Sequence, residues 1–324
     1  MNALFRLLAC ALLAAAALAI APVRASAQSI TCSATMTNVV FGTVNPLSSQ
    51  TDANATLNYS CTNSSNSATR YATVCFSIGD GAQGGGNANP RRMQDGSGNP
   101  LYFQLWQNAS RTTVWGSSFF GVNTPVDVDL TIARRATVTG SATMYGRVVN
   151  GQTTAVPGAY QDQFTGNHTA VTINESGSSP PGSCSTSILS QFPFTVTATV
   201  GSQCAVSAST LDFGTVGLLT ANTDNTSALT VQCASGVAYQ VGLDNGQHAT
   251  GTTRRLQGPG GFVTYELYRN TGRTQRWGTT LNSDTVAGNG NGSNQALTVF
   301  GRVPGQTTPS AGTYNDTITV TVTY

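Results

Sequence analysis

The amino-acid sequence predicts an all-β protein built of two tandem immunoglobulin-like β-sandwiches. Short runs of alternating apolar and polar residues recur along the chain, among them TLNYSC, YATVCFSI and YFQLWQN. Such alternation gives an extended strand one apolar and one polar face. Clusters of Gly, Asn, Asp and Pro separate the runs, and no segment beyond the first 27 residues has helical periodicity over several turns. About six to eight strands of this kind in each half fit a sandwich domain.

An internal repeat divides the chain into these two domains. The motif FGTV occurs at 41–44 and again at 213–216, and GQTT occurs at 151–154 and again at 305–308. Further blocks recur in the same order: RRM (91–93) and RRL (254–256), LYFQLW (101–106) and VTYELY (263–268), YGRV (145–148) and FGRV (300–303), PGAYQD (157–162) and AGTYND (311–316). The same order over so many blocks indicates two copies of one domain, with insertions in the first.

The first 27 residues are typical of a secretory signal peptide. Arg6 supplies a positively charged start, and the segment LLACALLAAAALAIA is apolar. Ala25–Ala27 form a small-residue cleavage pattern, so we expect the mature chain to begin at Gln28. A membrane anchor is the alternative, but the apolar run is short and rich in alanine. Export of the protein is therefore predicted.

The mature chain is poor in charge. Charged residues make up 9% of the sequence, against about 25% in an ordinary soluble domain. There is no lysine, and removal of Arg6 and Arg24 leaves 13 arginines against 13 acidic residues. The sequence has no basic stripe for nucleic acid and no polybasic tail for anionic lipid. A surface of Thr, Ser, Asn, Gln and Gly without net charge suits a subunit of a polymer.

Six cysteines remain after removal of the signal peptide, and an even number in an exported chain predicts disulfides. One bridge within each copy follows from the repeat, because the first two cysteines of each copy have the same separation. The other two cysteines have no counterpart in the second copy and are paired with each other. The predicted bridges are Cys32–Cys61, Cys204–Cys233 and Cys75–Cys184. Zinc is the weaker alternative, because there is no CxxC pair and both histidines lie far from any cysteine cluster.

Positions that both copies share are most simply explained by the fold. Because the RR pairs occur in both copies, they are expected to have a structural role near a turn rather than to bind a ligand. The shared aromatic residues are expected in the core or at a strand corner. These positions are Trp115 and Trp277, Tyr160 and Tyr314, Phe41 and Phe213, Trp106 and Tyr268, Arg91-Arg92 and Arg254-Arg255.

The repeated blocks resemble the spore coat protein U domain, the subunit fold of archaic chaperone–usher pili. The resemblance lies in the Cys, Phe-Gly-x-Val and Tyr-x-Cys pattern that opens each copy, in the Trp and the YGRV or FGRV of its middle, and above all in the closing AGTYNDTITVTVTY. It covers nearly the whole mature chain and implies an incomplete sandwich that lacks its last strand. In that family a periplasmic chaperone first lends a strand, and the N-terminal extension of the next subunit then replaces it, which is strand addition at an open sheet edge.

Residues 190–204, SQFPFTVTATVGSQC, have the alternation expected of such a donor strand. Its inward-facing side chains are predicted to be Phe192, Phe194, Val196, Ala198 and Val200. The first copy has no comparable extension, since only four residues would precede Cys32. We therefore predict that 190–200 completes the first domain within the same chain. The second domain, which stops directly after its TITVTVTY strand, is predicted to be incomplete and to accept the donor strand of the next subunit.

A chain that accepts a strand and has none to give is expected at the tip of the fibre. The predicted division is a signal peptide (1–27), an N-terminal tip or adhesin domain (28–189), a linking strand (190–203) and a C-terminal pilin domain (204–324). The expected partners are a periplasmic pilus chaperone, an outer-membrane usher, the next pilin subunit, and an abiotic or host surface. The protein would pass through the periplasm and be displayed at the cell surface, at the pilus tip.

Residues that occur only in the first copy are the candidate contacts of an adhesin. The loop 116–126, GSSFFGVNTPV, carries Phe119, Phe120 and Val122 where the second copy has GTTLNSDTV. Adjacent Phe residues cannot both point inward along a strand, so at least one is expected to be exposed as an apolar contact patch. The alternative is that both pack beneath the insertion as a satellite cluster. The glycine-rich loop 79–90 is expected to be a plain flexible loop.

No catalytic residue, metal site or cofactor is predicted. The mature chain has two His and two Glu, and no GxSxG, HExxH or paired-carboxylate motif. Its aspartates lie mostly in turns rich in Gly and Asn, and no DxDxDG spacing supports a calcium site. The leading hypothesis is a non-enzymatic tip adhesin that acts in surface attachment and biofilm formation, through either apolar loops or a lectin-like polar pocket. The alternative is a purely structural pilin-like or coat-layer subunit without ligand binding.

Overall fold

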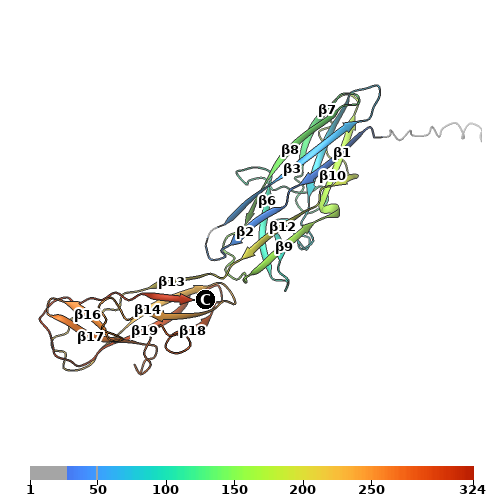
Figure 1. The fold of residues 1–324 in the computed structure, drawn as a ribbon. Helices are drawn as coiled ribbons and strands as arrows, with labels where there is room; N and C mark the ends of the chain where they lie inside the picture. Colours follow the sequence, from blue (N-terminus) through green and yellow to red (C-terminus); the bar gives the residue numbers. More distant parts are fainter. Residues whose placement is uncertain (1–27, 49) are drawn as a thin grey trace, which may run out of the picture.

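The computed structural model describes residues 28–48 and 50–324, and its regular structure is almost entirely β-strand (Figure 1). The predicted signal peptide therefore lies outside the described residues. Within the two described ranges, no helix is long and apolar enough to cross a membrane. The strands form two separate sets of paired sheets, one in each half of the chain, which confirms the prediction of two tandem β-sandwiches.

The N-terminal half contains twelve strands and one short 3₁₀ helix. Their bounds are β1 (Ile30–Met36), β2 (Val39–Val44), β3 (Thr51–Asn63), β4 (Arg70–Ile78), β5 (Arg91–Gln94), β6 (Pro100–Trp106), β7 (Val126–Ile132), β8 (Thr137–Val148), β9 (Gly158–Phe164), η1 (Gly166–His168), β10 (Thr169–Ser176), β11 (Ile188–Gln191) and β12 (Phe194–Val200). One sheet has the order β1-β3-β8-β6-β5-β9-β12-β2, and the other has the order β11-β10-β4-β7. One hydrophobic core draws buried residues from both sheets.

The C-terminal half repeats this plan with fewer strands. Their bounds are β13 (Cys204–Ala208), β14 (Thr223–Cys233), β15 (Ala238–Leu243), β16 (Arg254–Gly258), β17 (Gly261–Tyr268), β18 (Val286–Asn289), β19 (Gln295–Val303) and β20 (Val320–Thr323). One sheet has the order β13-β14-β19-β17-β16, and the other has the order β18-β15-β20. A second core lies within this half.

Each half buries one arginine and one tryptophan in the same arrangement. Arg91 is fully buried and its Nη2 donates to the carbonyl oxygens of Ile78 (2.8 Å) and Trp115 (2.7 Å). Arg254 donates in the same way to the carbonyl oxygens of Leu243 and Trp277. The guanidinium satisfies carbonyl groups that strand pairing leaves free, so the first arginine of each RR pair is structural. Burial lowers the pKa of Arg91 to about 9, which leaves it charged at neutral pH.

The two tryptophans and tyrosines also have equivalent bonds. Trp115 Nε1 donates to the Phe76 carbonyl oxygen at 2.8 Å, and Trp277 Nε1 donates to the Val241 carbonyl oxygen at 2.9 Å. The Tyr160 hydroxyl bonds the carbonyl oxygen four residues upstream, which is a tyrosine corner, and Tyr314 makes the same bond. Trp106 and Tyr268, in contrast, are half-buried and not part of either core.

The motifs GQTT and YGRV or FGRV also have structural explanations. The Gln152 amide accepts from the Tyr102 backbone nitrogen and donates to the Tyr102 carbonyl oxygen, as a neighbouring strand would. Gln306 does the same with Thr264. The arginine of the second motif makes a two-pronged ion pair across neighbouring strands, Arg147 with Asp52 and Arg302 with Asp224. These bonds hold the pairs β3–β8 and β14–β19 together.

Three disulfides are present, in the pairs that the sequence predicts. Cys32–Cys61 joins β1 to β3, and Cys204–Cys233 joins β13 to β14 at the same register position. Cys75–Cys184 joins β4 to the segment between β10 and β11. The third bridge therefore ties down the chain just before it forms β11 and β12.

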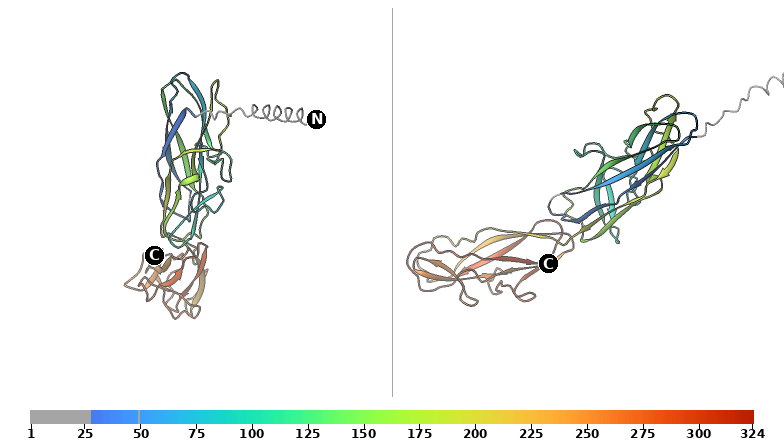
Figure 2. Two further views of the ribbon diagram at one scale, coloured as in Figure 1. Left: turned by 90° about the vertical axis from the view of Figure 1, so that its right-hand side faces the viewer. Right: turned by 45° about the horizontal axis from the view of Figure 1, so that its top comes forward.

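The N-terminal half has two ends with different surroundings (Figures 1 and 2). At one end Val200 pairs with Gly158 of β9 and Val44 of β2, and the chain leaves for the C-terminal half. At the opposite end of β3 and β8, Thr62 pairs with Thr137. We call this opposite end, made by 28–29, 64–69 and 133–136, the distal end.

Candidate strand-acceptor site

Strand β12 lies between β9 and β2 in the large sheet of the N-terminal half (Figure 1). It pairs antiparallel with β9 along its whole length, from Phe194 opposite Phe164 to Val200 opposite Gly158. It also pairs parallel with β2, from Val196 opposite Val39 to the end of both strands. The segment that links the two repeats is thus a strand of the first one.

Every second side chain of this segment enters the core of the N-terminal half. Phe192 and Val196 are 0% exposed, and Phe194, Ala198 and Val200 are at most 4% exposed. The Phe194 ring stacks on Phe164 with the ring centroids 4.6 Å apart. The threonines between them face the other way and are half-buried or exposed. The five buried side chains are the ones that the alternation in the sequence selects.

The same segment also serves the smaller sheet. Before β12, strand β11 pairs antiparallel with β10. Between the two strands the chain passes from one sheet to the other, and the Phe192 nitrogen donates to the Thr169 carbonyl oxygen at 3.2 Å. Residues 188–200 therefore supply a strand to each sheet, and Cys184 anchors the chain just before them.

In the C-terminal half, the two segments equivalent to β2 and β9 have no strand between them. Residues 211–216 contain the second FGTV, and residues 312–319 contain the second tyrosine corner. One side of 312–319 bonds to Gln257 and Gln247, as β9 bonds to β5 and the loop after β4 in the first copy. No sheet partner joins 211–216 in the part of the chain that the structure describes. We call these two segments together the acceptor site.

A comparison of equivalent residues in the two copies shows which side chains a strand between these two segments covers. Val39, Phe41 and Val44 of the first copy are at most 5% exposed, because β12 and the core enclose them. Their equivalents Leu211 and Phe213 are only half-buried, and Val216 is 38% exposed.

Other residues of the C-terminal half follow the same trend. Tyr160 is 1% exposed and Phe164 is fully buried, whereas the equivalent Tyr314 and Ile318 are half-buried. In β13, Val206 is 39% exposed, while the equivalent Ala34 of β1 is 8% exposed. The acceptor site is therefore an open sheet edge bordered by incompletely buried apolar side chains.

The loop 116–126, which the sequence suggested for apolar surface contact, is less exposed than expected. Phe119, Phe120 and Val122 are all half-buried, so the expectation that at least one Phe is exposed is wrong. The Phe120 ring stacks on His168 with ring centroids 4.3 Å apart, and the loop packs beside Ala88. The alternating-strand argument failed because the loop folds back onto η1 and the 79–90 loop. The satellite-cluster alternative describes this packing better, and a contact role for these three residues stays a prediction.

The 79–90 loop is held by several polar bonds. Arg92 Nε donates to the Gln83 carbonyl oxygen, and the Gln83 backbone nitrogen donates to Asp162 Oδ1. Asp80 is 3% exposed, accepts from the Gly86 nitrogen and lies 3.1 Å from His168 Nδ1. Asp162 is 1% exposed, and its burial raises its pKa to about 7.

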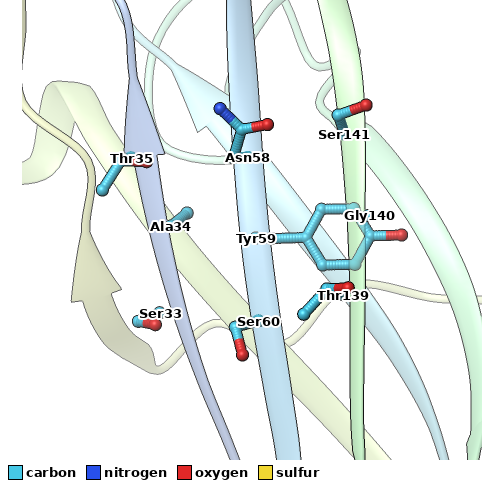
Figure 3. A pocket seen from close by; sticks show the side chains of 9 residues that line it. All are labelled: Ser33, Ala34, Thr35, Asn58, Tyr59, Ser60, Thr139, Gly140 and Ser141. Carbon is cyan, nitrogen blue, oxygen red and sulfur yellow. The ribbon is translucent and has the colours of Figure 1, made fainter.

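A shallow polar hollow lies on the face of β1, β3 and β8 (Figure 3). Its volume is about 430 Å³, and its lining has hydroxyl and amide groups, one tyrosine and no charged residue. Figure 3 shows the Tyr59 ring lying across β8 over Gly140, where a larger residue would collide with the phenol. The lining residues are Ser33, Ala34, Thr35, Asn58, Tyr59, Ser60, Thr139, Gly140 and Ser141.

Nothing in the described ranges resembles a metal centre, since no three His, Cys, Asp or Glu side chains there could hold one ion. His168 and Asp80 form a pair without a third member. The chemistry that this chain offers at the acceptor site is strand pairing and apolar burial.

The fold and the acceptor site define a protein of two tandem β-sandwiches, the first of which is completed by the strand that links them. The sequence profile of the Spore Coat Protein U domain matches residues 17–167 and 190–321, which together make up most of the chain. The chain therefore belongs to the Spore Coat Protein U domain family. Comparison with curated proteins gives no significant match.

Solved structures with a similar fold include a pilus tip subunit. The chain is 18% identical to a chain of the CsuC–CsuE chaperone–tip adhesion subunit pre-assembly complex, from the archaic chaperone–usher Csu pili of Acinetobacter baumannii. This match covers 91% of the present chain and 100% of the other, with a TM-score of 0.53, and it shows a shared fold. The CupB6 tip adhesin of Pseudomonas aeruginosa is 10% identical over 90% of this chain and 94% of its own, with a TM-score of 0.35.

The raised pKa of Asp162 predicts that the N-terminal half loses stability as the pH rises. Between pH ~4 and pH 7 the folded state holds a proton on this carboxyl that the unfolded state, with a pKa of ~3.9, has released. The free energy of unfolding should therefore fall by about 2–4 kcal/mol from pH 4 to pH 8 through this group. Urea unfolding of the chain at several pH values measures it. The variant Asp162→Asn should remove this part of the pH dependence, whereas the control Asp127→Asn, at an exposed position, should not. If the free energy of unfolding of wild type and of Asp162→Asn varies with pH in the same way, Asp162 is not the group responsible.

Proposed function

We propose that this chain is a subunit of an archaic chaperone–usher pilus and forms its tip. The observation that carries the proposal is the difference between the two copies: β12 lies between β2 and β9 in the first, and no strand lies between 211–216 and 312–319 in the second. The first domain thus has its own last strand, whereas the second presents an edge for a strand from another chain. Strand addition at such an edge is a known mode of association.

Apolar burial would drive the association. Leu211, Phe213, Val216 and Ile318 would become enclosed as their equivalents in the first copy are. Full burial of such a side chain contributes about 1.5–3 kcal/mol of stability. Because these side chains are already partly buried, the incoming strand would add only the share that belongs to their exposed surface. Main-chain hydrogen bonds along both edges would fix the register. The exposed edge would also make the free chain prone to aggregation, which explains the need for a chaperone.

The proposed division of the mature chain is an N-terminal adhesin domain (28–189), a linking strand that completes it (190–203) and a C-terminal pilin domain (204–324). A periplasmic chaperone would bind the acceptor site first, and an outer-membrane usher would exchange it for the donor strand of the next pilin subunit. The fibre would then carry the N-terminal domain at the cell surface, where it would mediate attachment and biofilm formation. In this role the chain is not an enzyme.

A structural pilin-like or coat-layer subunit remains the second candidate. It accounts equally well for the acceptor site, but it gives no reason for the insertions and the third disulfide of the first copy. The specialised first domain favours the adhesin.

The first experiment supplies the C-terminal half with a strand. A copy of 190–200 is fused behind Tyr324 through a short flexible linker, and the matched control fusion carries Asp at the positions of Phe194 and Val196. We expect the fused strand to raise the melting temperature of the C-terminal half and to convert aggregating chain into monomer, because it covers the acceptor site. Calorimetry and size-exclusion chromatography measure both effects. If the unfused chain is already a stable monomer and neither fusion changes its melting temperature, these two segments do not accept a strand.

The second experiment tests the strand already in place. Val196→Asp buries a carboxylate in the core of the N-terminal half and should cost about 3 kcal/mol or more, because the side chain is fully buried. Thr199→Asp changes an exposed residue of the same strand and should cost less than about 1 kcal/mol. Chemical unfolding of the two variants measures the difference. Equal stability of the two would show that β12 does not complete this domain in solution.

A further inference from the structure

The distal end of the N-terminal half is a hydrogen-bonded polar structure that the second copy lacks. Asn63 is fully buried there, and its Nδ2 donates to the carbonyl oxygens of Ala68 (3.0 Å) and Ile132 (3.0 Å). Its backbone nitrogen donates to the Ala136 carbonyl oxygen, and its Oδ1 accepts from the Ser65 nitrogen. One side chain thus joins the loops 64–69 and 133–136. The equivalent residue in the second copy is Ser235, which cannot make these bonds.

Two adjacent arginines project from this end. Arg134 and Arg135 form the turn between β7 and β8, and both are exposed. Arg135 has a φ of 54°, an uncommon conformation for this residue type, and its Nε donates to Asn66 Oδ1 at 2.7 Å. The corresponding turn of the second copy, 290–294 between β18 and β19, has the sequence GNGSN, which carries no charge and places Gly292 at a positive φ. The arginines are therefore not required by the turn.

These arginines differ from three other arginines of the N-terminal half, which are held in ion pairs. Arg70 pairs with Glu175, and both Arg111 and Arg147 pair with Asp52. Among residues 28–48 and 50–200, Arg134 and Arg135 make no ion pair, and no carboxylate lies on the loops 64–69 and 133–136. The Glu175 carboxylate accepts from the Ser29 and Ile30 nitrogens at this end, but it is paired with Arg70. In a mature chain without net charge, two uncompensated cations give the distal end a local positive potential.

The chemistry around the arginines selects the kind of ligand. Guanidinium groups bind carboxylate and sulfate oxygens through paired, charge-assisted hydrogen bonds. Ser64, Asn66 and Ser67 lie exposed on the neighbouring loop and offer hydroxyl and amide groups that suit sugar hydroxyls. Both loops lack aromatic and large aliphatic side chains, which a surface that inserts into a bilayer would need.

We propose that the distal end, through Arg134 and Arg135, binds acidic polysaccharide. The carboxylate or sulfate groups of the polymer would contact the two guanidinium groups, and its hydroxyls would contact Ser64, Asn66 and Ser67. The proposal names the ligand class of the proposed adhesin domain and rests on that role for its biological use. It concerns a surface distinct from the acceptor site, so binding can be measured without a pilus.

The experiment compares the full chain with the double variant Arg134→Ser/Arg135→Asn, in which Asn is chosen because it tolerates the positive φ. The probes are alginate, which carries carboxylates, dextran sulfate, and neutral dextran, each flowed over immobilised protein. We expect the full chain to bind at least one acidic polymer and not neutral dextran. The double variant should lose about tenfold in affinity, and about 0.5 M NaCl should abolish binding by the full chain.

A charge-matched control separates the site from the net charge of the chain. Arg111→Ser/Arg147→Ser removes two cations from the same half but from the pairs with Asp52, and it should bind the acidic polymers as the full chain does. A difference between alginate and dextran sulfate tells which anionic group is preferred. The proposal is overturned if neither acidic polymer binds, if both double variants lose affinity equally, or if phosphatidylglycerol vesicles bind and the polysaccharides do not. None of these outcomes bears on the strand-fusion experiment, so the two proposals fail separately.

Discussion

The insertion of β12 between β2 and β9 is the interaction on which the N-terminal half depends. It joins β2 to the rest of the large sheet, buries four of its own apolar side chains and covers three apolar residues of β2. Because β11 comes just before it in the chain, the same segment also extends the smaller sheet. A disulfide at Cys184 limits the freedom of this segment before it pairs, which lowers the entropic cost of ordering it.

The two halves are stabilised by the same set of polar anchors. A buried arginine, a tryptophan that donates to a strand carbonyl, a tyrosine corner, a glutamine that pairs with a backbone and an arginine–aspartate fork occur in both. The buried arginine interacts with neutral Gln104 in the first half and with Glu266 in the second. Since these anchors account for most of the shared motifs, the differences between the halves are the better guide to function.

Two of those differences lie far apart in the chain's architecture. One is the acceptor site, where apolar residues that are buried in the first half remain partly exposed in the second. The other is the distal end, where Asn63 bonds to two neighbouring loops, one of which carries two arginines that make no ion pair. An apolar edge suits permanent association with another strand, and an exposed polar surface suits reversible contact, so the two proposed roles differ in their chemistry.

The sequence alone determined the all-β class, the duplication, the bridges and the five inward-facing residues of 192–200, because alternation, repeat order and cysteine spacing are local or periodic signals. Loop packing could not be predicted from the sequence: at least one of Phe119 and Phe120 was expected to be exposed, but Phe120 stacks on His168 and the loop packs beside Ala88, both distant in sequence. The distal arginines were missed for the same reason, although the turn 290–294 of the second copy, GNGSN, has no arginine and this difference was visible in the sequence. Only the tertiary structure decides which loops share an end of the sandwich and which cations have a carboxylate nearby, since both depend on contacts between strands far apart in the chain.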